Sequence, residues 1–133
     1  MAAHSFPRTV RLTRPSEFKR VFRQSVVSSD RCFRVLAGQG QGRGQGSAPR
    51  LGMAVSRRAE RTSVGRNRIK RIVRESFRHR FTARGASPAG MPMDIVVLPH
   101  PGCATISNAQ LFRSLELHWA RIVTKFKEHQ WET

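Results

Sequence analysis

Residues 66–78 read RNRIKRIVRESFR, and the rest of the chain is organised around this stretch. At the helical period of about 3.6 residues, its apolar side chains fall on one stripe and most of its basic side chains fall opposite. This pattern predicts an amphipathic helix with one buried side and one cationic side. Thr62 or Ser63 would cap its start, and the pattern ends near Arg84. The apolar stripe consists of Ile69, Ile72, Val73, Phe77 and Phe81.

The cationic side of this helix indicates a polyanionic partner. Its cations recur four residues apart, and each such like-charged pair costs a helix about 0.2–0.5 kcal/mol. Glu75 is the only acid between Arg61 and Met93, so no ladder of ion pairs relieves this repulsion. The phosphates of a nucleic acid would relieve it instead. The candidate contact residues are Arg66, Asn67, Arg68, Lys70, Arg71, Arg74 and Arg78.

The composition of the whole chain supports the same partner. The chain has 133 residues, enough for one domain, and a net charge of +17 from 25 Lys and Arg against 8 Asp and Glu. Most of the cations are Arg, whose planar guanidinium suits bidentate phosphate contacts. Disorder is the alternative, but the chain is 38% hydrophobic and strongly patterned. Composition favours nucleic-acid binding and leaves DNA and RNA both open.

Two further helices are predicted, one on each side of the basic helix. The first starts near Pro15, a residue typical of the first helical turn, and carries Phe18 and Phe22 one turn apart. The second starts at Ser107, which has the spacing of a capping box with Gln110, and its apolar stripe runs to residue 126. This last helix is less basic than the central one, so we expect it to have a structural role.

Strand patterns occupy the segments between these helices. Residues 31–36 and 51–56 alternate like strands, and residues 94–98 form an apolar, β-branched run typical of a strand covered on both faces. Residues 38–48 are rich in Gly and Gln, and we expect a flexible hairpin loop there. A third short strand or a turn is expected near residues 57–61.

No constellation for catalysis by the protein itself is present. The acids are scattered, and no pair has a spacing that would hold two metal ions for phosphodiester cleavage. The histidines lack ligand spacing, so we expect no metal site, although His79 or His118 as a general base stays an alternative. Cys32 and Cys103 indicate reduced thiols in a cytoplasmic protein. No apolar run is long enough to span a membrane.

The basic helix resembles the RNR signature of the bacterial ribonuclease P protein subunit. The RNR triplet at 66–68 is followed by Lys70, Arg71 and Arg74, and the resemblance extends in order over residues 11–126. The other matching segments are the helix with Phe18 and Phe22, the strand at 31–36, the Gly-x-x-Val-Ser-basic-basic stretch at 52–58, the apolar strand at 94–98 and the helix at 107–126.

This resemblance implies roles for the matching positions. The family assists a catalytic RNA in removing the 5′ leader from precursor tRNA, so the protein would be part of an enzyme whose catalytic residues lie in the RNA. The basic helix would contact that RNA and help to hold Mg²⁺ near the interface, with most of the Mg²⁺ bound by the RNA. The first helix and the sheet would form a cleft for the leader. The leader-binding residues would be Phe18, Phe22, Arg57 and Arg58.

Two departures from the family's pattern concern this cleft. The family often has an aromatic residue at the end of the first strand, where this chain offers Val35 and Leu36 and contains no Tyr. The family often has a basic pair after the apolar strand, where this chain has His100 between two prolines. His100 would be at best a weak substitute for that pair.

Together these observations predict an α+β fold in the order αβββαβα, with a four-stranded mixed sheet and packed helices. The resemblance implies a sheet like that of ribosomal protein S5 domain 2, with a left-handed βαβ crossover, whereas general rules give a right-handed one in about 98% of cases. The single domain would carry a loose basic arm at 1–12 and a frayed tail at 127–133.

The function that this reading favours is that of the ribonuclease P protein subunit. Its partners would be the catalytic RNA and precursor tRNA, and no protein partner is implied. The alternative is a ribosome-associated or general RNA-chaperone protein without a processing role. A third possibility is an autonomous nuclease, against which the scattered acids argue.

Overall fold

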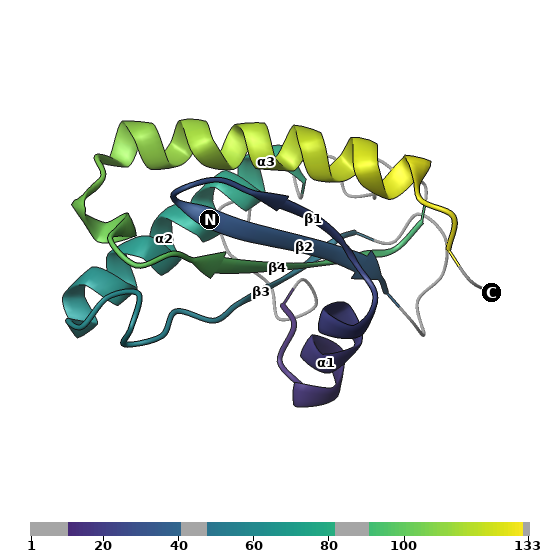
Figure 1. The fold of residues 1–133 in the computed structure, drawn as a ribbon, viewed down its shortest axis with the longest axis horizontal. Coiled ribbons are helices and arrows are strands. Elements are labelled where there is room, and N and C mark those ends of the chain that lie inside the picture. The colour runs from purple at the N-terminus through teal and green to yellow at the C-terminus, as the bar shows by residue number, and fades with distance from the viewer. Residues whose placement is uncertain (1–10, 41–47, 82–90, 132–133) are drawn as a thin grey trace, which may run out of the picture.

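The computed structural model describes residues 11–40, 48–81 and 91–131, and its elements follow the expected order (Figure 1). None of the helices in these ranges is long and apolar enough to cross a bilayer. The elements are α1 (Pro15–Arg23), β1 (Val26–Ser29), β2 (Phe33–Gln39), β3 (Arg50–Met53), α2 (Ser63–Arg80), β4 (Met93–Pro99), the 3₁₀ turn η4 (Cys103–Thr105) and α3 (Asn108–Glu128).

The strands form one mixed sheet in the order β1-β2-β4-β3. β2 is antiparallel to both of its neighbours, and Val35 lies opposite Val97 of β4. β3 runs parallel to β4, with Leu51 beside Ile95. Because α2 joins these two parallel neighbours, it lies within a βαβ unit, as the family resemblance implied. The left hand of this crossover stays a prediction.

The sequence analysis missed one strand. The first strand, β1, lies at Val26–Ser29, where the sequence has only two apolar residues before two serines and shows no alternation. Pairing with β2 holds it, with Val27 opposite Leu36. Near residues 57–61, where the sequence left a short strand or a turn open, residues 57–59 form a turn, and the N–H of Ala59 donates to Ser56 Oγ at 3.2 Å.

The segment at 38–48 is not a hairpin loop. β2 and β3 do not pair with each other, because β4 lies between them in the sheet. Gly38 and Gln39 belong to β2, where they lie opposite Asp94 and Met93. Residues 41–47 of the expected flexible loop lie outside the described residues.

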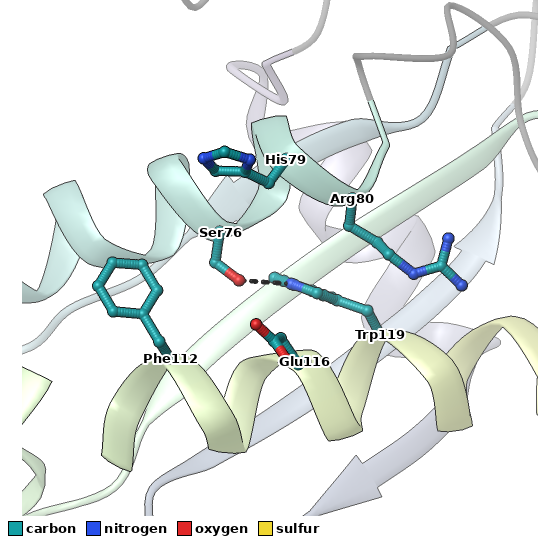
Figure 2. Close-up of a pocket in the computed structure, with 6 residues that line it drawn as sticks. All are labelled: Ser76, His79, Arg80, Phe112, Glu116 and Trp119. Atoms are coloured by element: carbon teal, nitrogen blue, oxygen red, sulfur yellow. Dashed lines mark hydrogen bonds between the residues drawn. The ribbon is translucent and has the colours of Figure 1, made fainter. Parts of the chain in front are cut away.

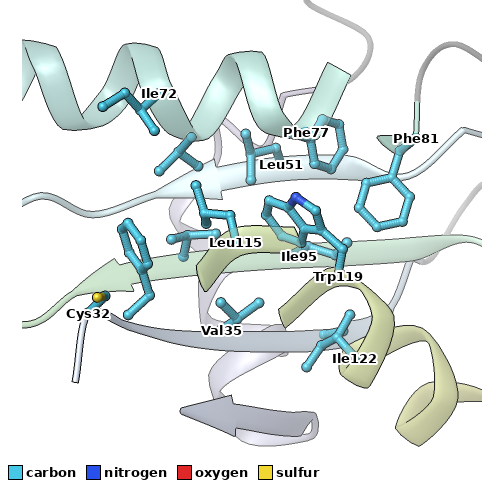
Figure 3. Packing of buried hydrophobic residues seen from close by; sticks show 14 of the residues in the cluster. Cys32, Val35, Leu51, Ile72, Phe77, Phe81, Ile95, Leu115, Trp119 and Ile122 are labelled. Carbon is cyan, nitrogen blue, oxygen red and sulfur yellow. The ribbon is translucent and has the colours of Figure 1, made fainter. Parts of the chain in front are cut away.

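α2 and α3 cover one face of the sheet and enclose the main core (Figures 1 and 3). The predicted stripe of α2 is buried, with Ile69, Val73 and Phe77 fully inaccessible. Trp119 of α3 packs edge-on against Phe77 at 6.0 Å between ring centroids, and its indole N–H donates to Ser76 Oγ at 2.8 Å. Burial of each such large side chain stabilises the fold by about 1.5–3 kcal/mol.

α1 covers part of the opposite face through a smaller core. Its Val21 is buried with Leu12, Leu36 and Val96. Gly52 of β3 makes room for this packing, because a Cβ there would come within 2.7 Å of the Phe18 ring.

Arg50 ties the start of α1 to the sheet. Its guanidinium contacts both Asp94 oxygens, at 3.0 and 2.9 Å, and also Glu17 Oε2 at 2.7 Å. Burial alone would raise the pKa of Glu17, but the N–H groups of Arg14 and Thr13 and the Arg50 guanidinium outweigh burial and lower it. This basic side chain therefore serves the fold.

The caps and ends of the helices agree in part with those predicted from the sequence. Thr62 caps α2, and its Oγ1 accepts the N–H of Gly65 at 3.0 Å, but α2 ends at Arg80, before the expected end near Arg84. Residues 82–90 lie outside the described residues. Ser107 caps α3 as predicted, accepting the N–H of Gln110 at 3.2 Å.

Two expected loose segments make contacts at their inner ends. Of the expected basic arm, residues 1–10 lie outside the described residues, while the N–H of Leu12 donates to the carbonyl of Leu51 at 2.9 Å. Of the expected frayed tail, residues 127 and 128 belong to α3. Trp131 stacks on Phe126, and its indole N–H donates to the Phe126 carbonyl at 3.1 Å.

Candidate nucleic-acid interface

The outer side of α2 presents cations to solvent. Asn67 and Arg71 are exposed, and Lys70 and Arg74 are partly exposed beside them, as is Arg78 one turn further on. Across the described ranges, no carboxylate lies within 4.0 Å of Lys70, Arg71 or Arg74. The buried stripe fixes the rotation of the helix, so these side chains project as one group. We call Asn67, Lys70, Arg71, Arg74 and Arg78 the α2 basic face.

Arg68, the second arginine of the RNR triplet, is engaged within the protein. Its Nε donates to Asn108 Oδ1 at 2.8 Å. Its two terminal nitrogens donate to the carbonyls of Ala104 at 2.9 Å and Ile106 at 2.7 Å. Arg68 thus fastens η4 and the start of α3 to α2, a role that the sequence pattern did not reveal. Its contact with RNA stays a prediction.

Arg66 has a similar engagement on the other side of α2. Its Nη1 donates to the carbonyls of Glu60 at 3.0 Å and Arg61 at 2.8 Å. Those carbonyls belong to the turn that leads from β3 into the helix. The two arginines of the triplet therefore brace the segments on both sides of the α2 basic face, and Asn67 between them is exposed.

The two candidate leader-binding aromatics have different surroundings. The Phe18 ring lies against Gly52 and Leu12 and belongs to the smaller core. Phe22 is 50% exposed, which is unusual for a large apolar side chain. Phe22 is thus the side chain of α1 that is open to a ligand, and Phe18 mainly supports the packing of the helix.

Arg57 and Arg58 are exposed in the turn that joins β3 to α2. α1 packs against β3 at Gly52, and Figure 1 shows the turn beyond the end of β3, away from α1. The structure therefore does not gather the four candidate leader-binding residues into one cluster. On the strand surface between them, Arg34 of β2 is exposed and lies opposite the partly buried Leu98. Arg34 was not among the residues that the sequence analysis selected for the site.

A cavity of about 390 Å³ lies between α2 and α3, on their outer surface (Figure 2). The Trp119–Ser76 hydrogen bond forms its floor. None of the residues predicted to contact RNA or leader lines it, so it lies apart from the candidate interface. The lining residues are Ser76, His79, Arg80, Phe112, Glu116 and Trp119.

Comparison with known proteins bears on what this surface binds. The sequence matches the family model described as Ribonuclease P over residues 6–123. It is 42% identical over 120 residues to the ribonuclease P protein component of Thioalkalivibrio sulfidiphilus, which covers 90% of this chain and 91% of that protein. It is 44% identical over 117 residues to that of Methylococcus capsulatus, covering 87% and 83%. The chain belongs to the ribonuclease P protein family.

Solved structures share the fold of this ribonuclease P family member. The Staphylococcus aureus RNase P protein matches with a TM-score of 0.70 and 24% identity, covering 86% of this chain and 97% of that one. The Thermotoga maritima protein matches with a TM-score of 0.62 and 24% identity, covering 91% and 98%. The predicted α+β fold is thus confirmed, and at this identity the likeness concerns the fold alone.

The described part of this ribonuclease P family member holds no group of three or more His, Cys, Asp or Glu that could bind a metal ion. His118 is fully buried, so it has no access to a substrate, whereas His79 is exposed. Burial raises the pKa of the Cys103 thiol to about 12, which keeps it protonated at neutral pH.

Asp30 belongs to a partly buried network that fixes the β1–β2 turn to α3. Its carboxylate accepts the N–H groups of Cys32 and Phe33 and the hydroxyl of Ser114, the last at 2.6 Å. His118 Nε2 lies 3.1 Å from Asp30 without the alignment of a hydrogen bond, and its Nδ1 is 2.7 Å from Ser28 Oγ. Burial alone would raise the pKa of Asp30, but these hydrogen bonds outweigh burial and lower it.

Proposed function

We propose that this protein binds the catalytic RNA of ribonuclease P through the α2 basic face and promotes removal of the 5′ leader from precursor tRNA. The observation that carries the proposal is the surface itself. Within the described residues, Lys70, Arg71 and Arg74 have no carboxylate within 4.0 Å, and they project from a helix whose other side is buried in the core. Phosphate oxygens are the natural partners of such a surface, and membership of the family favours RNA.

The leader would bind on the side of the sheet that carries α1. Phe22 would stack on a base, for which alanine substitutions elsewhere give about 1–3 kcal/mol. Arg34 would contact the leader backbone, and Arg57 and Arg58 would extend that contact toward α2. Phe18 would act through packing, since its ring holds α1 against Gly52.

The chemistry would reside in the RNA. The described carboxylates and histidines form no cluster that fits a protein-held metal centre. Mg²⁺, if bound by the RNA, would supply charge stabilisation for phosphodiester cleavage. The cations of the α2 basic face would neutralise RNA phosphates that otherwise require Mg²⁺, so that the complex needs less of it.

A reconstitution assay tests this function. Precursor tRNA is incubated at low Mg²⁺ with the protein alone, with an in vitro transcript of bacterial ribonuclease P RNA alone, and with both. We expect leader removal only, or much faster, in the mixture. Cleavage by the protein alone would identify an autonomous nuclease. Absence of stimulation in the mixture would favour an RNA-binding protein without a processing role.

A further inference from the structure

Two adjoining hollows lie at the end of the molecule where the β1–β2 turn, η4 and the first turns of α3 meet. Their volumes are about 410 and 230 Å³. Arg31, Ile106 and Gln110 line both, so the two hollows adjoin along these residues. Figure 1 shows these elements at the same end of the molecule as the start of α2. We call this feature the η4–α3 groove.

The walls of the groove are fixed by hydrogen bonds. On one side, Asp30 holds the β1–β2 turn through the N–H groups of Cys32 and Phe33 and binds Ser114 of α3. On the other side, Arg68 holds the carbonyls on both sides of Thr105. The groove therefore exists before any ligand arrives, which lowers the entropic cost of binding.

The lining combines cations with apolar surface. Arg31 and Arg113 are both exposed, and within the described ranges no carboxylate lies within 4.0 Å of either. Asp30 also lines the groove, but its oxygens are engaged in the hydrogen bonds described above. Leu117 is 51% exposed at one end, and Ile106 is partly exposed in the middle. Cations beside apolar side chains suit a single-stranded nucleic acid, whose phosphates and bases alternate.

The groove lies next to the start of α2 and so close to the α2 basic face. Arg68 Nη2 donates to the carbonyl of Ile106, the residue shared by both hollows, and Arg68 follows Asn67 directly on α2. An RNA strand that leaves the α2 basic face at the start of α2 would therefore reach the groove after passing Arg68. A second copy of this chain is disfavoured as the occupant, because each copy has a net charge of +17.

We propose that the η4–α3 groove binds a single-stranded segment of the same RNA that contacts the α2 basic face. Arg31 and Arg113 contact its phosphates, while Ile106 and Leu117 contact its bases or riboses. Gln110 offers an amide to a base edge. This inference rests on the proposed function, and it gives α3 a binding role in addition to its structural one.

The first test measures the salt dependence of RNA affinity. The full chain carrying Arg31→Ala and Arg113→Ala is titrated against an in vitro transcript of bacterial ribonuclease P RNA over a range of KCl concentrations. Each lost phosphate contact lowers the log–log slope by about 0.7–0.9, so we expect a total decrease of about 1.4–1.8. The matched control is Arg121→Ala with Lys127→Ala, which removes the same charge from exposed positions of α3 that do not line the groove. The control should keep the wild-type slope.

The second test does not depend on the arginine variants being stable. Gln110→Cys and, as its control, Thr124→Cys are labelled with a photoactivatable aryl azide; both native cysteines are buried, which directs the label to the new thiol. We expect cross-links from position 110 to a restricted set of RNA nucleotides and far fewer from position 124. Equal cross-linking from positions 110 and 124 would overturn the proposal that the groove binds RNA. A salt-dependence slope of the Arg31→Ala, Arg113→Ala variant equal to that of the charge control would also overturn it. Wild-type protein that fails to bind the RNA overturns the proposed function instead.

Discussion

Phe18 and Phe22 show how one helical turn separates a packing role from a binding role. The Phe18 ring fills the space left by Gly52, where any Cβ would collide with it. Phe22 leaves 50% of its surface in contact with water. The spacing of the two residues indicates one apolar stripe on α1, but only the position of β3 decides which ring is covered.

Substitution of each ring by alanine separates these roles. Phe22→Ala is expected to leave the melting temperature nearly unchanged and to weaken binding of precursor tRNA, while binding of mature tRNA, which lacks the leader, stays the same. Phe18→Ala is expected to lower the free energy of unfolding by about 2–3 kcal/mol, less than the about 3–5 kcal/mol of a fully buried Phe. Equal loss of stability in both variants would show that Phe22 also belongs to the core.

A second prediction at the residue scale concerns Asp30 and the pH dependence of stability. The hydrogen bonds of the folded protein lower the pKa of Asp30 below its ordinary value of 3.8. The Asp30 carboxylate therefore stabilises the fold fully above about pH 4, and this stabilisation is lost progressively as the pH falls from 3.8 toward the lowered pKa. Asp30→Asn removes the charge at every pH. The stability difference between wild type and variant, measured by urea unfolding, should therefore be largest near neutral pH and shrink below about pH 4. A difference that stays constant down to pH 2 would contradict this account.

At the scale of elements, Arg68 connects α2 to the segment that begins α3. One guanidinium contacts Asn108 Oδ1 and the carbonyls of Ala104 and Ile106. Hydrophobic contacts also hold this segment, because Cys103 is buried in the main core and Ala104 and Ile106 pack against it. Arg68 adds a hydrogen-bonded link that helps to set the position of the η4–α3 groove relative to the α2 basic face.

Arg68→Lys tests this connection because it keeps the charge and loses the fork of donors. We expect a loss of about 1.5–3 kcal/mol in the free energy of unfolding, the range for hydrogen bonds to a charged group. Asn108→Ala should cause a smaller loss, and the double variant should lose less than the sum of the two. Strict additivity, or a stable Arg68→Lys variant with reduced RNA affinity, would show that Arg68 acts mainly on RNA.

The elements differ in how far their sequences predict them. α2 and α3 were predictable because their apolar stripes and caps are local, and the stripes are buried as expected. β1 was not, because two valines and two serines carry no alternation and their strand form depends on β2 and on His118. For the site, the outward direction of Lys70, Arg71 and Arg74 followed from periodicity. The internal bonds of Arg68 depend on a segment about 40 residues away in sequence, which no local pattern encodes.

At the scale of the whole molecule, the chain carries a net charge of +17, and the residues that the structure describes form few ion pairs with one another. α2 and α3 cover one face of the sheet, so the α2 basic face and the η4–α3 groove lie on that layer. α1 lies on the other face with Phe22 exposed. This arrangement places the proposed contacts with catalytic RNA and with leader on different sides of one sheet, so that both can be made at once.

The salt dependence of RNA binding by an α2 variant tests the central claim most directly. The variant carries Arg71→Ala and Arg74→Ala, and its affinity for ribonuclease P RNA is measured beside the Arg121→Ala, Lys127→Ala control of equal charge. The account predicts that the log–log slope falls by about 1.4–1.8 for the α2 variant and is unchanged for the control, with both proteins still folded. Equal slopes for the two variants would place the RNA elsewhere and contradict the account.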